Sequence, residues 1–274
     1  MFFDFNKKVY KKDSWSELKK IELNDLGSCI QLESDMLNRM QNKEYACSYI
    51  RKREKDEFEK IIKNGELYGI YDLNNNHLIG LINIDDLPFE RLTKYFTYDN
   101  GNFSISDELL NFYKKYKGIY FSCLMTDLDP KNVGLGKYII YSSQVYARDV
   151  LKKDYVVAEI NIYNRASYRL FTSFFTFGCC NKIIPFSSLD AKKIEIPVFY
   201  ITSILNSELS IKFKESVFNN KIQKFSYSNN CNIDDMIRNR ETDQILQPDE
   251  LLMFDLSLVF KIKINLDILK NINY

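Results

Sequence analysis

Histidine is almost absent from this chain of 274 residues, in which His77 is the only one. Six cysteines are present, but no two are spaced as C-x-x-C: Cys29, Cys47, Cys123, Cys179, Cys180 and Cys231. A zinc site built from Cys and His needs several such ligands at short spacing, so we expect no metal. His77 stands beside a predicted turn, where we expect it to be exposed rather than catalytic.

Long apolar runs are missing as well. No run approaches the roughly 18 residues that a membrane-spanning helix needs. The first residues, MFFDFNKKVYKK, lack the apolar core and the cleavage site of a signal peptide. Free thiols without an export signal are typical of a reducing compartment. We therefore expect a cytoplasmic protein with no membrane partner.

Neither sign of charge is in excess, since 38 Lys and Arg stand against 37 Asp and Glu, for a net charge of +1. No bulk field therefore favours nucleic acid, and we expect none as a partner. Hydrophobic residues make up 45% of the chain and charged residues 27%, which is ordinary for a globular protein. The length allows one large domain, or one domain with an appendage.

The most informative stretch that is present covers residues 121–137, FSCLMTDLDPKNVGLGK. An apolar run at residues 119–125 predicts a strand, and a polar turn follows it. Gly134 and Gly136 come next, and a helical pattern begins at Lys137. Two glycines let the backbone approach an anion closely, and the free N–H groups of a helix start point to the same place. The stretch favours a phosphate site, although the same glycines also fit a simple tight turn.

The glycine loop matches neither of two common phosphate motifs. Tyr138 occupies the Ser or Thr position of a Walker loop, and Ile139 occupies the third glycine position of G-x-G-x-x-G. Lys131, Gly134 and Gly136 form K-x-x-G-x-G instead. This resembles the Q/R-x-x-G-x-G/A signature of the GNAT family of acetyl-CoA-dependent N-acetyltransferases, with Lys in place of the usual Gln or Arg.

The segments after the loop extend the resemblance. A predicted helix and a predicted strand at residues 155–162, YVVAEINI, precede Asn164. Asn164 opens a segment that is similar to the family's N-x-x-A/S-x-x-x-Y/F, and Phe171 ends it. The order and spacing of these parts carry the resemblance, which covers roughly residues 15–203.

The resemblance implies the family's fold, an α/β (α+β) architecture in which helices flank a mixed, mostly antiparallel central sheet with splayed strands. Residues 1–205 would form this domain, with an insertion at about 85–117 that is either a substrate lid or a decoration. Residues 206–274 would be a C-terminal extension of unknown role.

Hydrophobic and turn patterns predict the other elements: a helix at 26–40 capped by Asn24-Asp25, a helix at 49–64, a hairpin at 66–84, a helix at 107–116, and strands at 182–185 and 195–204.

The resemblance also gives acetyl-CoA, as acyl donor, a place in the fold. Backbone groups of Leu124, Met125 and Thr126 would pair with the pantetheine arm, and one N–H there would face the thioester oxygen. Asn164 would lie near the same arm or cap the next helix, and these two roles are compatible. The pyrophosphate would be held by backbone N–H groups of the loop: Asn132, Val133, Gly134, Leu135, Gly136 and Lys137.

Glu159 is the candidate general base. It stands in A-E-I-N, which is similar to the L-E-V-x of family members that use this Glu as base, and burial in an apolar strand would raise its pKa. The alternative is a Glu paired with Lys or Arg at the end of a strand. Asp85 and Asp86, after the predicted hairpin, are the other candidates for the base.

The general acid is an open question, because the family's usual Tyr is replaced by Phe171, which has no hydroxyl. Tyr163 or Tyr168 would have to take its place, or the thiolate leaves without help. Cys123 lies beside the cofactor strand, where alternation with Leu124 predicts a packed thiol rather than a nucleophile.

The sequence thus predicts an N-acyltransferase that moves an acetyl group directly to a primary amine of a small molecule or peptide, within a ternary complex. A homodimer is left open. One alternative is a GNAT-like module that holds CoA without turnover, which Phe171 favours. The other is an unrelated phosphate-binding domain in which the glycine loop is only a turn.

Overall fold

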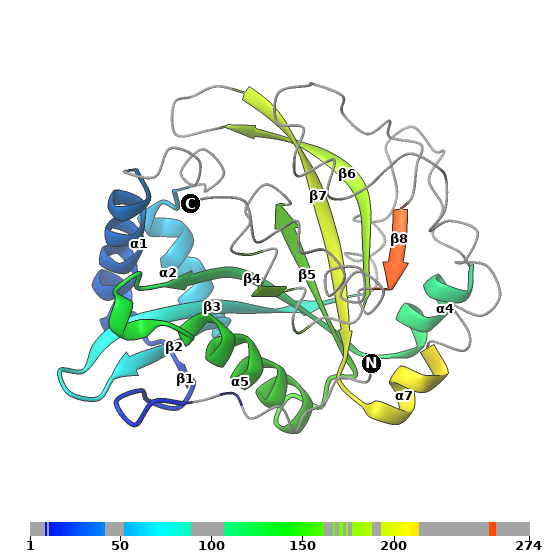
Figure 1. Cartoon of the computed structure of the whole chain (residues 1–274), viewed down its shortest axis with the longest axis horizontal. Helices are drawn as coiled ribbons and strands as arrows, with labels where there is room; N and C mark the ends of the chain where they lie inside the picture. Colours follow the sequence, from blue (N-terminus) through cyan, green and yellow to red (C-terminus); the bar gives the residue numbers. More distant parts are fainter. Residues whose placement is uncertain are drawn as a thin grey trace, which may run out of the picture.

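The computed structural model describes residue 9 and residues 11–41, 52–88, 107–161, 167, 170–171, 174, 177–187, 193–213 and 252–255. Its centre is an eight-stranded sheet in the order β1-β2-β3-β4-β5-β7-β6-β8 (Figure 1). All neighbours are antiparallel except β4 and β5, which are parallel. The expected mixed, mostly antiparallel sheet is therefore confirmed. The strands are β1 (Lys19–Lys20), β2 (Leu67–Asp72), β3 (His77–Leu87), β4 (Gly118–Thr126), β5 (Tyr155–Asn161), β6 (Phe177–Ser187), β7 (Lys193–Ile204) and β8 (Leu252–Asp255).

Helices flank this sheet, as expected (Figure 1). α5 (Leu135–Asp149) packs on β3, β4 and β5, whereas α1 (Leu26–Gln41) packs on β3 and β4 and also contacts α2 (Lys55–Asn64). α7 (Ser207–Phe213) follows β7 and contacts it, and α4 (Asp107–Lys115) precedes β4. After β5, the described residues Ser167, Leu170 and Phe171 are helical.

The predicted helix starts are only partly right. A 3-10 turn, Leu23–Asp25, precedes α1, and Asn24 lies inside it rather than capping the helix. The N–H of Glu22 donates to Oδ2 of Asp25 at 3.4 Å, one half of a reciprocal capping box. α2 begins at Lys55 rather than at residue 49, and it ends as expected before Gly65, whose φ of 73° is the left-handed conformation that a helix C-terminus favours.

Several strands also differ from their predicted ranges. β3 runs to Leu87 instead of residue 84, since its last residues continue to pair with the start of β4. β6 extends beyond both ends of the strand predicted at residues 182–185, so that Cys179 and Cys180 lie within it. The C-terminal strand β8 joins the same sheet by pairing with β6. The division into residues 1–205 and 206–274 remains a prediction.

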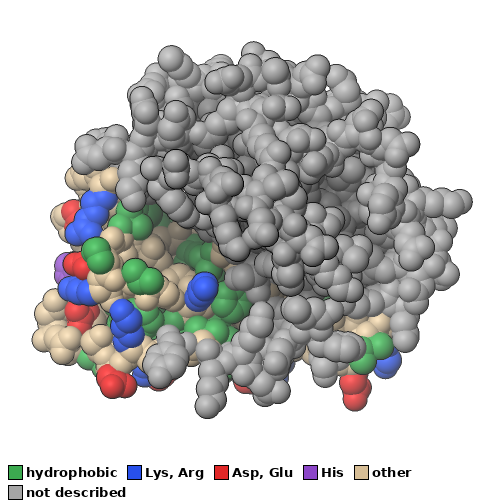
Figure 2. Space-filling model, in the orientation of Figure 1, with side chains coloured by type: hydrophobic (Ala, Val, Ile, Leu, Met, Phe, Trp, Pro, Cys, Tyr) green, Lys and Arg blue, Asp and Glu red, His purple; other side chains and the backbone are tan. Residues whose placement is uncertain are grey.

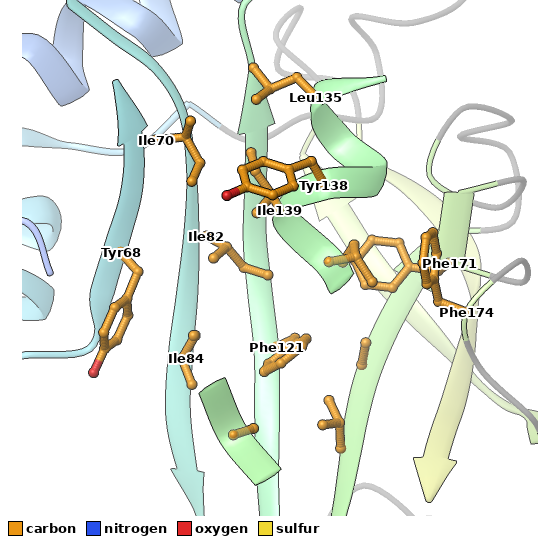
Figure 3. Close-up of a cluster of buried hydrophobic side chains, with 14 of the residues drawn as sticks. Tyr68, Ile70, Ile82, Ile84, Phe121, Leu135, Tyr138, Ile139, Phe171 and Phe174 are labelled. Carbon is orange, nitrogen blue, oxygen red and sulfur yellow. The ribbon is translucent and has the colours of Figure 1, made fainter. Parts of the chain in front are cut away.

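One face of the sheet packs against α5 in an apolar cluster (Figure 3). Ile82 and Ile84 of β3 and Phe121 of β4 meet Leu135 and Ile139 of α5 there, and all five side chains are buried. Further members come from β5 and from the segment after it: Val156, Ala158, Ile160, Phe171 and Phe174.

A second apolar cluster lies on the opposite face, because Leu81 alternates with Ile82 along β3 and belongs to it. Met125 of β4 is another strand member. The helices and the segment before them supply further members: Ile21, Cys29, Leu32, Met36, Phe58 and Ile62. The sheet is thus a middle layer, with α5 on one side and α1 and α2 on the other.

On the face shown in Figure 2, Lys and Arg side chains of the described residues are interspersed with hydrophobic ones. Among the described residues no helix is both long and apolar enough to cross a membrane. The same residues contain no cluster of three or more His, Cys, Asp and Glu that would hold a metal ion. His77 is exposed, as expected.

Candidate functional site

The parallel strands β4 and β5 separate halfway along their length. They pair only from Gly118–Tyr155 to Phe121–Ala158. Beyond that point β4 continues to pair with β3 as far as Thr126, and β5 continues to pair with β7 as far as Asn161. The inner edges of the two strands therefore part, and the backbone groups of β4 that face β5 are no longer used by the sheet. These are the splayed strands that the sequence predicted.

A β-bulge in β4 lies at the start of this opening. The register with β3 changes from Leu81–Met125 to Asn83–Ser122, so that two residues of β4 oppose one of β3. Cys123 occupies the bulge with a φ of +53°, a conformation that costs a non-glycine residue about 1–2 kcal/mol. Bulges re-aim the strand that contains them and are frequent beside active sites.

The thiols near the bulge are packed. Cys29 of α1 is fully buried, and burial raises the pKa of its thiol to about 12. Cys123 is partly buried and packs against the same cluster. A thiol held this far from ionisation is a poor nucleophile, so Cys29 has a structural role. The packing of Cys123 against this cluster agrees with the packed thiol expected at that position.

The glycine loop ends at the N-terminus of α5. Gly134 is the N-cap, with φ 94° and ψ −8°, a conformation that strains any L side chain. The first intrahelical bond runs from the Tyr138 N–H to the Gly134 carbonyl at 3.1 Å. Within the described part of the chain, the N–H groups of Leu135, Gly136 and Lys137 donate no hydrogen bond. Three donors and the positive end of the helix dipole are thus available to an anion.

Gly136 lies close to residues of two neighbouring segments. A Cβ at this position would be 3.0 Å from Cδ2 of Leu170 and 3.8 Å from Cγ2 of Thr126. The helix start is therefore packed directly against the end of β4. The donors of α5 and the splayed part of β4 belong to one continuous region.

Asn132 and Val133 differ from the other loop residues. Their N–H groups donate to the carbonyls of Asp129 and Pro130, at 2.8 and 3.3 Å, within the 3-10 turn Pro130–Asn132. They are therefore engaged inside the protein, unlike those of residues 135–137. These two residues form the base of the loop rather than its free end.

The side chain of Asn132 has a bracing role. It is buried, accepts a hydrogen bond from Nε1 of Trp15 at 3.3 Å, and donates to Oδ2 of Asp127 at 3.1 Å. Asp127 also forms an ion pair with Arg39 of α1 at 3.3 Å. Nothing in the local sequence indicated this network, because its members are far apart along the chain. It holds the loop between the N-terminal segment and α1.

Lys131, at the Gln or Arg position of the family signature, lies on the outside of the loop. Its N–H donates to Oδ1 of Asp129 at 2.9 Å, and its ammonium is 3.7 Å from Oδ2 of Asp72. Lys12 donates to the Lys131 carbonyl and lies over the ring of Trp15. The departure from the signature is thus accommodated by ion pairing with β2.

Glu159 lies at the opening between the strands. It is the first residue of β5 beyond the last β4–β5 pair, and it is half-buried. Because Ala158 and Ile160 belong to the α5 cluster, alternation places Glu159 on the other face of the sheet. Asp85 of β3 is buried on that same face, whereas Asp86 is exposed and pairs with Lys153. Of the three candidate bases, Glu159 and Asp85 therefore lie on the site's face and Asp86 does not.

The buried, apolar position of Phe171 suits a ring without a hydroxyl. Its ring is buried in the α5 cluster beside Phe174 (Figure 3). A tyrosine hydroxyl there would need a hydrogen-bond partner in an apolar environment. The alternatives Tyr163 and Tyr168, as well as Asn164, lie outside the described residues.

No protein-family model matches the chain, and no curated protein matches its sequence. Solved structures do resemble it. Spermidine N-acetyltransferase from Vibrio cholerae, in complex with CoA and spermine, is 12% identical with a TM-score of 0.47, over 72% of this chain and 99% of that one. A GNAT-family acetyltransferase from Bacillus anthracis is 12% identical with a TM-score of 0.44, over 71% and 97%. An N-acetyltransferase from Staphylococcus aureus is 15% identical with a TM-score of 0.45, over 70% and 99%. At such low identity, what each of these proteins binds is a property of that protein alone.

Proposed function

We propose that this chain is an acyl-CoA-dependent N-acyltransferase that uses acetyl-CoA and transfers the acetyl group directly to a primary amine of a small molecule or peptide. The observation that carries the proposal is the meeting of three features in one region. These are the splay of β4 from β5, the bulge at Cys123, and the unbonded N–H groups at the start of α5. Residues 1–205 would form the catalytic domain, and residues 206–274 would extend it.

The residues fit acetyl-CoA in two ways. The N–H groups of Leu135, Gly136 and Lys137 suit the pyrophosphate, because they combine free donors with the helix dipole. The backbone of Leu124, Met125 and Thr126 offers groups along the opening that an amide-containing arm can pair with. Asn132 and Val133 would support this surface without donating to the ligand, since their N–H groups are engaged.

Bound acetyl-CoA supplies a thioester, whose carbon–sulfur bond is exchanged for a carbon–nitrogen bond to the amine while a thiol is released. Glu159 would accept the proton that the amine loses, directly or through water. A backbone N–H near Leu124 would stabilise negative charge on the thioester oxygen. The buried Phe171 also favours a second candidate, a module that binds CoA without turnover.

The deciding experiment is a calorimetric titration with acetyl-CoA, with desulfo-CoA and ADP as controls. Micromolar binding that depends on the pantetheine arm, followed by amine-dependent thiol release, would support the enzyme. Binding without thiol release for any amine would favour the module. Binding no tighter than that of ADP would remove both candidates.

The loop itself is tested by Gly134→Trp. A Cβ at Gly134 meets no atom of the described residues within 4 Å, so the indole would extend over the helix start where the phosphate is proposed to lie. We expect the affinity for acetyl-CoA to fall at least about a hundredfold, because direct donors and dipole are blocked together.

Gly65→Trp is the matched control for the Gly134 variant. Gly65 has the same left-handed conformation, at the end of α2, and among the described residues its Cβ would meet only the flexible end of Lys20. Gly65→Trp should lower the free energy of unfolding about as much as Gly134→Trp does, while leaving the affinity for acetyl-CoA unchanged. Equal affinities of the two variants would contradict the placement of the pyrophosphate.

A further inference from the structure

The face of the sheet turned away from α5 changes character along its length. Under α1 and α2 it is apolar, with Leu81 and Met125 in the second cluster. Past the bulge, alternation with Ile82 and Ile84 places Asn83 and Asp85 of β3 on this face. Their partners on β4 are Ser122 and Tyr120. A row of polar side chains therefore follows the apolar part of the same face.

Asn83 is the unusual member of this row. Its side chain is 5% exposed, and Nδ2 donates to Oγ of Ser122 across the strands at 3.1 Å. Its Oδ1 is buried and has no hydrogen-bond partner among the residues that the structure describes. The Ser122 hydroxyl can satisfy only one end of the amide, so the other end is left over whichever way the amide is turned. A buried carbonyl without a partner loses the hydrogen bonds that it would make in water, and a bound donor would restore one of them.

The location of this oxygen connects it with the reaction. The Asn83–Ser122 pair is the last one in register before the bulge at Cys123. Glu159 lies on the same face, one residue beyond the end of the β4–β5 pairing. An amine brought to the opening between the strands would therefore have its remaining part beside Asn83 and Asp85.

We propose that Asn83, with the Asp85 carboxylate beside it, recognises the acceptor, and that the acceptor is an amine that carries a second hydrogen-bond donor such as an ammonium or hydroxyl group. This inference rests on the proposed function. Both groups accept hydrogen bonds, so the complementary ligand is a donor, and the carboxylate favours a cation. A site built to bond a polar group discriminates strongly against an analogue that lacks it, because its own polar atoms are then left unpaired.

Three amines of equal heavy-atom count test the proposal: 1,4-diaminobutane, 4-amino-1-butanol and 1-aminopentane. They differ only in a terminal ammonium, hydroxyl or methyl group. With acetyl-CoA we expect kcat/KM to be at least about tenfold higher for the diamine and the amino alcohol than for aminopentane. Asn83→Leu should remove most of this preference, chiefly by raising KM for the two polar amines. Asn83→Asp keeps an acceptor oxygen and should retain the preference for the diamine.

Gln144→Leu is the matched control. Gln144 lies on α5, on the other side of the sheet. It is likewise a fully buried amide, and its polar atoms have no hydrogen-bond partner within the described part of the chain. Its replacement removes the same chemistry without touching the proposed site. The ratios of kcat/KM among the three amines should therefore equal those of the wild type.

The outcomes separate this inference from the proposed function. Equal kcat/KM for the three amines, or ratios that survive Asn83→Leu, would overturn the inference and leave the N-acyltransferase standing. If acetyl-CoA binds but no amine is acetylated, the same three amines are titrated into the complex of the protein with desulfo-CoA. Equal affinities for the three amines, or no binding of any of them, would overturn the inference about Asn83. Failure to bind acetyl-CoA removes the proposed function and this inference together.

Discussion

The two faces of the central sheet differ in what they present to their helices. Toward α5 the strands β3, β4 and β5 contribute only apolar residues to the core cluster, such as Ile82, Phe121 and Ala158. Toward the opposite side the same strands present Asn83, Ser122 and Glu159, each one residue away along its strand. The face toward α5 therefore serves stability, whereas the opposite face combines an apolar part under α1 and α2 with the polar groups of the proposed site. The predictions below test that separation, from the largest expected effect to the smallest.

Glu159→Gln, on the polar face, should lower activity without lowering stability. If Glu159 is the base, kcat falls about 10²- to 10⁴-fold, and the rise of the rate with pH that accompanies ionisation of the carboxylate is flattened. Affinity for acetyl-CoA should stay at the wild-type value. The measurement is a pH–rate profile of thiol release with the best amine found. An unchanged profile would remove Glu159 from this role and direct attention to Asp85.

Phe121→Ala should lower stability and leave the pH dependence of catalysis unchanged, since Phe121 lies on the apolar face. Phe121 is fully buried in the α5 cluster, so its truncation should lower the free energy of unfolding by about 3–5 kcal/mol. Denaturant unfolding measures this loss, and the pH–rate profile of the remaining folded enzyme should not change.

Ser122→Ala is the control for Phe121→Ala, because it is the next residue and faces the other way. Its hydroxyl accepts one hydrogen bond, so the expected loss is about 1 kcal/mol. A loss of the same size for both variants would show that the two faces do not divide stability and function as described.

Glu33→Gln has the smallest expected effect. Glu33 of α1 is buried, and burial raises the pKa of its carboxyl even though the Arg53 N–H donates to it at 3.1 Å. The folded protein then binds the proton more tightly than the unfolded chain, so stability falls as pH rises from the ordinary Glu value of 4.5 to the raised one.

Thermal melting of wild type and Glu33→Gln across this range isolates that contribution. The difference between their melting temperatures should shift in favour of the variant as pH rises, and then level off above the raised pKa. A difference that stays constant with pH would mean that Glu33 does not titrate in this range.

Much of the fold was predictable because its signals are local. Apolar runs and a polar turn indicated β2, β3 and β5. The glycine loop indicated the helix that follows it, which starts at Leu135 rather than at the predicted Lys137. What the sequence did not indicate depends on distant partners. Asn132 meets Trp15, 117 positions away, and Asn83 meets Ser122, 39 positions away. The left-handed Cys123 had no local signal either, since cysteine has no preference for that conformation.

The hydrogen bond between Trp15 and Asn132 has a practical consequence. Trp15 is the only tryptophan of the chain, is almost completely buried, and has its ring centroid 5.7 Å from that of Tyr138 in the first turn of α5. The tryptophan fluorescence of the protein therefore comes from a single indole ring, which is hydrogen-bonded to the base of the glycine loop. A conformational change of this loop therefore changes the wavelength and intensity of the tryptophan emission, which can be followed in real time without a label.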